Sequence, residues 1–295
     1  DHASERRLRR CVALYYAACS LIDHQVGRLL NALEEADILD ETLIVFTGDH
    51  GELLGDFRAC QKMSPYEASS RVPLIMRWPE RLEAGRVCED LTGCTDLFPT
   101  FMDAAGVEHP VLAELPGQSL LGADGGGLAE ARRDWVTCFG TGGSRWLSLR
   151  ERGVKYNYYC DNGFEELYDL DADPSEAHNL LLEGAAGARA TADGMRARLV
   201  AWEIENGFPE TSVADGDFRS FGSTGPALRR NNQFPHWVDY APDEVKRQLE
   251  PPGRGIEEAL AREDSFDIEE LDLSFFKEVG GSFEGSRWEG LLERY

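Results

Sequence analysis

The sequence predicts an α/β domain followed by a small antiparallel sheet. Two observations predict it. An apolar pattern with helical spacing over residues 8–36 leads into a short apolar block at 42–46, and from residue 135 onward short alternating segments are separated by turns. Helix, strand, polar loop, strand and helix, in that order, are typical of an α/β fold. The 295 residues, 42% of them hydrophobic, are enough to bury a core of this kind.

The first half carries the α/β pattern. The helical pattern breaks at residues 37–41, and the block 42–46 (TLIVF) is continuous, apolar and rich in β-branched residues. Such a block predicts a strand buried on both faces of a parallel sheet. Residues 72–76 predict a second strand of this type, and residues 96–105 predict another helix.

The second half is expected to form the small sheet. The glycine-rich segment 117–127 predicts a surface connection. Four short segments then alternate in hydrophobicity and predict strands: 135–139, 146–149, 154–159 and 166–169. Residues 185–205 predict a closing helix. Residues 206–295 predict an acidic extension, irregular but partly helical, with helical patches at 243–249 and 255–262.

Composition excludes some functions. The net charge of -24 argues against nucleic acid as a partner, because that binding draws its affinity from neutralising phosphates. No apolar run approaches the roughly 18 residues that a membrane span needs. The seven cysteines include no C-x-x-C pair and no zinc-like spacing, and their odd number leaves at least one thiol unpaired. Residues 1–10 do not resemble a signal peptide, and the first residue is not Met, so we expect sequence upstream.

A candidate site follows the first predicted strand. Asp49 and His50 lie side by side where open α/β sheets bind ligands, and a carboxylate with an imidazole can share a metal ion. Gly48 and Gly51 permit the tight backbone that this needs. The alternative is an aspartate that caps the next helix beside an exposed histidine. Lys62 lies twelve residues further on, where it could return to the same crevice and neutralise charge on a leaving oxygen, or could be a surface lysine.

A resemblance to a known family extends over about residues 10–205. Six ordered segments carry it: 15–30 (YYAACSLIDHQVGRLL), 40–55 (DETLIVFTGDHGELLG), 62–79, 96–106, 116–120 (PGQSL) and 166–180 (ELYDLDADPSEAHNL). Together they resemble the latter half of a type I, formylglycine-dependent sulfatase of the alkaline phosphatase-like superfamily. The resemblance implies that residues 1–127 are the C-terminal half of the catalytic α/β domain, 128–205 a small antiparallel subdomain, and 206–295 an extension.

The resemblance also implies roles for the candidate residues. Asp49 and His50 match metal ligands of the family, and Lys62 matches the lysine that contacts the sulfate ester and stabilises the leaving group. The implied metal is most often Ca²⁺, which suits carboxylates, although the nitrogen ligand at His50 leaves Mn²⁺ or Zn²⁺ open. The implied substrate is a sulfated small molecule or carbohydrate. The usual location of family members implies a periplasmic or secreted protein, and the resemblance implies no particular oligomeric state.

The sequence also departs from the family. No Cys or Ser begins the Cys/Ser-x-Pro/Ala-x-Arg segment from which formylglycine is made, and there is no Asp-Asp pair for the other metal ligands. We therefore expect formylglycine in an upstream part and no activity from this chain alone. Two alternatives remain open: a phosphonate monoester or phosphodiester hydrolase of the same superfamily, in which similar Asp-His pairs occur, and a non-catalytic binding or scaffold remnant.

Several further features predict structure more than function. The acidic run 169–173 lacks the glycine and glutamate of a calcium loop, so it predicts a turn. The aromatic side chains of the small sheet are expected in its core rather than on a sugar platform; they are Trp146, Tyr156, Tyr158 and Tyr159. Arg145, Trp146 and Lys155 are candidates for substrate recognition, although structural roles are favoured for all three.

Overall fold

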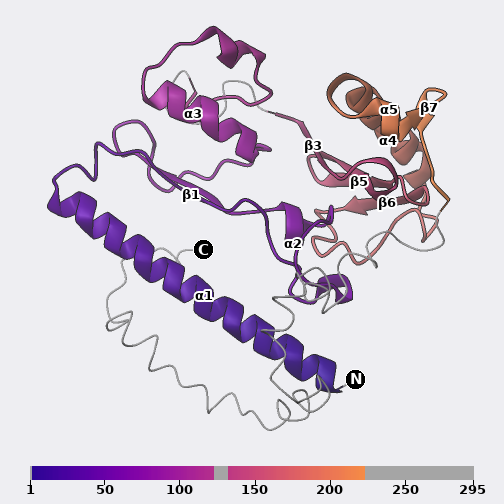
Figure 1. The fold of residues 1–295 in the computed structure, drawn as a ribbon, viewed down its shortest axis with the longest axis horizontal. Helices are drawn as coiled ribbons and strands as arrows, with labels where there is room; N and C mark the ends of the chain where they lie inside the picture. Colours follow the sequence, from indigo (N-terminus) through magenta and orange to yellow (C-terminus); the bar gives the residue numbers. More distant parts are fainter. Residues whose placement is uncertain (1, 123–131, 223–295) are drawn as a thin grey trace, which may run out of the picture. The chain divides into compact units, whose positions relative to one another are not determined.

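The computed structural model describes residues 2–122 and 132–222. Within these ranges, residues 2–42 belong to one compact unit and residues 43–222 to another, and Figure 1 labels their elements. Part of the glycine-rich connection (123–127) and the helical patches at 243–249 and 255–262 lie outside the described residues. All seven cysteines lie within them, and none forms a disulfide.

The first unit is one long helix. α1 spans His2–Glu35, which confirms the helix expected at 8–36. It ends because Asp37 adopts a left-handed conformation (φ 58°), while Ile38 N–H donates to the carbonyl of Leu33 at 3.0 Å. This arrangement is typical of a helix C-cap. No helix among the described residues has the length and apolar character to cross a membrane.

Two short strands begin the second unit. β1 (Ile44–Thr47) and β2 (Leu74–Arg77) confirm the two predicted strands, but they pair antiparallel, with Thr47 opposite Leu74. The expected parallel pairing and burial on both faces are therefore wrong for this pair, since their side chains are half-buried and Ile75 is exposed. An apolar run predicts that a segment is extended. It contains no information on the direction of the neighbouring strand or on what covers the two faces of the sheet.

Irregular segments with single helical turns connect the strands to the sheet that follows. Between β1 and β2 lie the 3-10 turn η1 (Asp56–Arg58) and the short helix α2 (Glu67–Ser70). After β2 come η2 (Cys94–Asp96), α3 (Leu97–Ala104) and η3 (Pro110–Glu114). The helix expected at 96–105 is confirmed as α3.

Asp96 holds the segment around α3 together. Its buried carboxylate accepts two hydrogen bonds from Arg132, at 2.7 and 2.9 Å, and one each from the backbone N–H groups of Gly93 and Gln118, both at 2.8 Å. Burial alone would raise the pKa of Asp96, but these donors outweigh it and lower the pKa. The ionised carboxylate thus fastens residues 93–118 to the chain that enters the next sheet.

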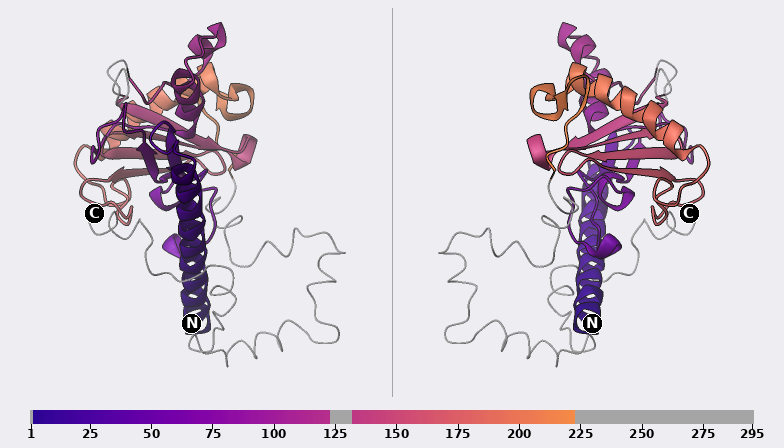
Figure 2. Two further views of the ribbon diagram at one scale, coloured as in Figure 1. Left: turned by 90° about the vertical axis from the view of Figure 1, so that its left-hand side faces the viewer. Right: turned by 90° about the vertical axis from the view of Figure 1, so that its right-hand side faces the viewer.

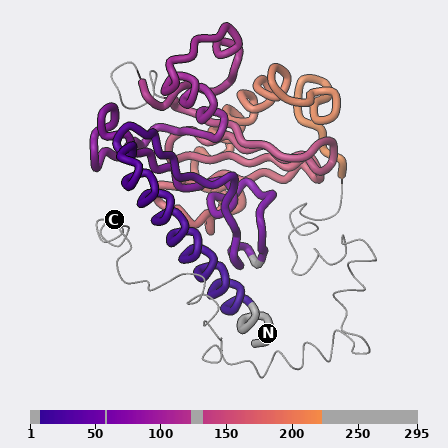
Figure 3. Tube along the Cα trace, turned by 60° about the vertical axis from the view of Figure 1, so that its left-hand side comes forward, coloured from indigo at the N-terminus to yellow at the C-terminus, as the bar shows by residue number. Residues whose placement is uncertain are grey.

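The second half of the chain forms the predicted antiparallel sheet. Its order is β3 (Asp134–Phe139), β4 (Trp146–Glu151), β5 (Val154–Tyr159) and β6 (Phe164–Asp169), side by side in Figure 3. The predicted closing helix is α4 (Ala188–Asn206), which lies across one face of the sheet (Figure 2). After β6 the acidic run makes a turn, as predicted, in which Asp169 Oδ1 accepts from the N–H groups of Asp171 and Ala172.

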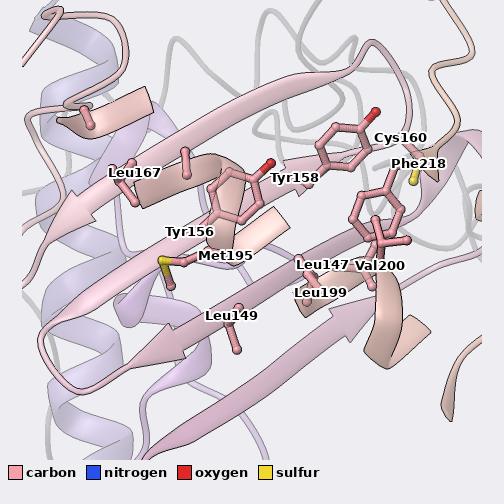
Figure 4. Close-up of a cluster of buried hydrophobic side chains, with 12 residues drawn as sticks. Leu147, Leu149, Tyr156, Tyr158, Cys160, Leu167, Met195, Leu199, Val200 and Phe218 are labelled. Atoms are coloured by element: carbon pink, nitrogen blue, oxygen red, sulfur yellow. The ribbon is translucent and has the colours of Figure 1, made fainter. Parts of the chain in front are cut away.

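Side-chain alternation gives the sheet two different faces. One face packs on α4 through an apolar core, shown in Figure 4, that includes Leu147, Leu149, Tyr156, Tyr158, Met195 and Leu199. The opposite face carries Trp146, Lys155, Asn157 and Tyr159, which are also buried. The aromatic group is therefore core, as expected, but it is divided between two faces because strand side chains alternate.

The start of the expected extension packs on the same sheet. α5 (Pro209–Ser212) precedes a two-stranded hairpin of β7 (Val213–Ala214) and β8 (Asp217–Phe218). Phe218 stacks on Tyr158 with ring centroids 4.6 Å apart. Residues 206–222 thus contribute to the core of the small sheet.

Candidate active site

Asp49 and His50 lie together on the loop after β1. His50 Nδ1 is 2.8 Å from the carbonyl oxygen of Gly51, and because a carbonyl only accepts, Nδ1 carries the hydrogen of the neutral ring. In the neutral form of the ring Nε2 keeps its lone pair, and it lies 3.5 Å from Asp49 Oδ2. The Asp49 side chain is 88% exposed. An imidazole nitrogen and a carboxylate oxygen thus face one point that is open to ligands.

This pair fits a divalent metal ion by its donor chemistry. Carboxylate oxygen and neutral imidazole nitrogen are both common ligands, and a backbone acceptor on the other ring nitrogen is the usual way in which a metal-binding histidine is oriented. Among residues 2–122 and 132–222, no group of three or more His, Cys, Asp or Glu side chains gathers around one point. The pair therefore supplies part of a coordination shell.

Gly51 attaches this loop to the short helix α2. Gly51 N–H donates to the carbonyl of Ser69 at 2.7 Å, and a methyl group on Gly51 would lie 2.1 Å from the carbonyl oxygen of Ala68. Gly51 is thus required by a close backbone approach to α2. Gly48 is different, because a methyl group there would meet only ordinary contacts, the nearest at 3.5 Å.

Lys62 lies on a loop that hydrogen bonds to this strand-end loop. Glu52 Oε1 accepts from the N–H of Gln61, and Leu53 N–H donates to the Gln61 carbonyl at 2.8 Å. The half-buried Lys62 makes no side-chain hydrogen bond or ion pair with any described residue, including Asp49 and His50. The structure thus brings Asp49 and His50 together directly and connects Lys62 to them through Glu52 and Leu53.

A buried polar network attaches α2 to the small sheet. The Glu67 carboxylate accepts from Lys155 at 3.0 Å and from Arg150 at 2.7 Å, while Lys155 also pairs with Glu176 at 2.9 Å. Burial raises the pKa of Glu176, although Lys155 acts in the opposite direction. The hydroxyl of Tyr66 donates to Glu166 at 2.8 Å. These contacts fix the chain just beyond Lys62.

The three candidates for substrate recognition have structural partners. Arg145 pairs with buried Glu203, Lys155 belongs to the network around Glu67, and Trp146 Nε1 donates to the carbonyl of Met63 at 3.0 Å. Structural roles are confirmed for all three. Sequence reasoning missed the supporting contacts of Glu52, Glu67 and Trp146, because each acts through a backbone group or a partner that is distant in the sequence.

Two protein-family models match the chain. The model described as Sulfatase matches residues 2–107, and the model described as N-sulphoglucosamine sulphohydrolase, C-terminal, matches residues 55–203, about half of the chain. The chain belongs to the sulfatase family. The second match includes the four-stranded sheet and α4, so this sheet is part of the sulfatase C-terminal region.

Individual proteins and solved structures are also similar to the chain. Arylsulfatase K of Gallus gallus is 36% identical over 195 residues, which cover 61% of this sulfatase chain and 35% of the relative. A solved structure in complex with its substrate, D-glucosamine-2-N, 6-O-disulfate, is 30% identical with a TM-score of 0.51, covering 61% of this chain and 38% of that one. The phosphonate monoester hydrolase of Agrobacterium radiobacter is 28% identical with a TM-score of 0.57, covering 74% and 46%.

These comparisons define what membership implies. The chain spans about a third of the length of the curated relatives that it matches. The fold is that of the alkaline phosphatase-like sulfatases, as expected. Membership of the sulfatase family implies, in general, a metal ion and a formylglycine.

Proposed function

We propose that this chain carries the metal-binding and leaving-group side of a sulfatase active site that hydrolyses sulfate esters. The observation that carries the proposal is the geometry of Asp49 and His50, whose Oδ2 and Nε2 face one point while Nδ1–H is held by the Gly51 carbonyl. Family membership and similarity to an arylsulfatase support it. That nucleic acid is not a partner remains an expectation from the net charge.

Asp49 and His50 would hold the divalent metal. Ca²⁺ is the proposed ion, with Mn²⁺ or Zn²⁺ as alternatives because of the imidazole nitrogen. When bound, such an ion polarises the oxygens of a sulfate group. Asp49 supplies negative charge from an exposed position, and the Gly51 carbonyl keeps the His50 lone pair aimed beside it.

Lys62 would act on the leaving group. The side chain of half-buried Lys62 has no acceptor among the described residues, so its ammonium is available to an anionic ligand. An ammonium beside the bridging oxygen is more valuable as the S–O bond breaks than before, because negative charge grows on that oxygen. The substrate that we propose is a sulfated small molecule or carbohydrate. The similar solved structure in complex with a sulfated glucosamine supports this class.

Metal binding by the purified 295-residue chain tests the proposal. Titration calorimetry with Ca²⁺, Mn²⁺ and Zn²⁺ should identify a preferred ion, and His50→Ala should weaken its binding by at least about tenfold. His178→Ala is the matched control, because His178 also pairs with a carboxylate, that of Glu183, at 2.9 Å. Equal affinities of the two variants would contradict the metal assignment.

Catalysis is tested separately. The 295 residues contain no formylglycine-forming segment, so we propose that the chain alone does not turn over 4-nitrophenyl sulfate. Similarity to a phosphonate monoester hydrolase supports a second candidate function on the same scaffold. Paired assays of the complete enzyme on aryl sulfate and aryl phosphonate esters distinguish the two, and a preference for the phosphonate would overturn the sulfatase proposal.

A further inference from the structure

The backbone on both sides of Lys62 adopts an unfavourable conformation. Gln61 has φ 69° and Met63 has φ 70°, in the left-handed region that residues other than glycine rarely occupy. Such conformations persist only where surrounding contacts enforce them, and they concentrate at functional sites. Because the Lys62 side chain has no partner among the described residues, the backbone at these two flanking residues sets the direction in which that side chain leaves the chain.

One contact set enforces the conformation on each side. Before Lys62, the Gln61 peptide is held at both ends, by Glu52 Oε1 at its N–H and by Leu53 N–H at its carbonyl. After Lys62, the Met63 carbonyl accepts from Trp146 Nε1 at 3.0 Å. The first set comes from the loop that carries the metal-ligand candidates, and the second comes from the small sheet.

Trp146 is a firm anchor. It is 6% exposed, it begins β4, and it pairs with Tyr159 on β5. The centroid of its ring lies 6.2 Å from the ring centroid of Phe139 on β3. The indole thus contacts residues of the strands on both sides of β4, which fix the direction of its N–H independently of the loop. The chain stays buried after Met63, since Ser64 and Tyr66 are also buried.

We propose that Trp146 is a positioning residue for Lys62. Its indole N–H holds the Met63 carbonyl and so fixes the backbone after Lys62, from which the Lys62 side chain extends, while Glu52 holds the backbone before it. The proposal rests on the proposed function of Lys62 as the sulfate-binding lysine. It gives the small sheet a direct part in the candidate active site, because that sheet supplies one of the two contacts that bracket Lys62.

The test removes the donor while keeping an aromatic ring. Trp146→Phe leaves the Met63 carbonyl without its partner, and hydrogen exchange of the amides at 61–63 in the full chain should become about tenfold faster. Trp78→Phe is the matched control, because the buried Nε1 of Trp78 has no partner among the described residues. Should Trp146→Phe fail to fold, benzothienylalanine at position 146 keeps the bicyclic shape and still lacks the N–H.

A second readout follows Lys62 itself. Amine-selective labelling is measured by mass spectrometry with Ca²⁺ present, with and without inorganic sulfate; the chain has only four lysines, and buried Lys155 is an internal reference. Sulfate should protect Lys62 in the unmodified chain, and the half-protecting concentration should rise about tenfold in Trp146→Phe.

Hydrogen exchange and sulfate protection together distinguish the positioning role of Trp146 from the proposed function of Lys62. If exchange and protection in Trp146→Phe match those in Trp78→Phe, the positioning role is overturned. If sulfate does not protect Lys62 in the unmodified chain, the proposed function of Lys62 fails, and faster exchange at 61–63 still supports the anchoring by Trp146.

Discussion

The ion pair of Arg145 and Glu203 is buried between β4 and α4, and its disruption should strongly destabilise the small sheet. Arg145 donates through Nε at 3.0 Å and Nη2 at 2.5 Å to the two carboxylate oxygens of Glu203, and the side chains are 3% and 0% exposed. Ser212 Oγ also donates to Glu203, at 2.5 Å. Arg145→Met would leave a buried carboxylate without its cation.

The expected magnitude follows from burial. Breaking one side of a buried ion pair costs about 3–5 kcal/mol, because the remaining charge stays desolvated. The chain contains a matched exposed arginine: Arg198 lies 2.5 Å from Glu151, with side chains 44% and 46% exposed, and also pairs with the exposed Asp134. Arg198→Met should cost only about 0.2–1 kcal/mol. Removing the stranded charge as well, in Arg145→Met/Glu203→Gln, should recover part of the loss.

Urea unfolding of the 295-residue chain, followed by circular dichroism, measures these differences. A loss of about 3–5 kcal/mol is a large part of the roughly 5–15 kcal/mol that stabilises a domain, so Arg145→Met should shift the midpoint strongly. Equal destabilisation by Arg145→Met and Arg198→Met would refute the reasoning. So would a double variant that is less stable than Arg145→Met, because it would show that the stranded charge is not the cause.

Three further predictions concern pH and glycine. Burial would raise the pKa of Glu165, but hydrogen bonds from two arginines and a tyrosine outweigh it and lower the pKa to about 2 from 4.5. The stabilisation that ionised Glu165 provides is therefore complete above about pH 4.5 and is lost as the pH falls towards 2. The difference in unfolding free energy between the native chain and Glu165→Gln should narrow over that range in acid titrations. Gly51→Ala should weaken metal binding in calorimetry and Gly48→Ala should not, because only the first methyl group meets the Ala68 carbonyl. Gly194→Ala, exposed in α4 with no atom within 4 Å of the new methyl group, should raise stability by about 0.5–1 kcal/mol in thermal unfolding.

The fold was predictable where periodicity decides it. The helical spacing of 8–36 and the alternating segments after residue 135 correspond to α1 and to β3–β6. The direction in which β1 and β2 pair was not predictable, because an apolar run contains no information about its neighbour. The second buried face of the small sheet was also missed, since Lys155 and Asn157 look like surface residues in a sequence, although both are buried here.

The residue types of the candidate site were predictable, but the contacts that hold those residues in place were not. Asp49, His50 and Lys62 are residue types that suit a metal ion and an anion. The contact of Trp146 with Met63 joins positions 83 apart through a backbone carbonyl, and no side-chain pattern marks it. Glu52 is similar, because its partner is the N–H of Gln61.

The spacing of twelve residues between His50 and Lys62 has a physical basis in these contacts. A free loop of that length could carry Lys62 to many positions. Here Gly51 N–H bonds to Ser69, beyond the loop, and Glu52 bonds to Gln61, within it, so the loop is closed at two points immediately after the metal-ligand candidates. Each closure removes conformations that the loop would otherwise sample. Because both points of attachment follow His50 directly, a movement of Asp49 and His50 would carry the backbone before Lys62 with it, while Trp146 holds the backbone after Lys62 to the sheet.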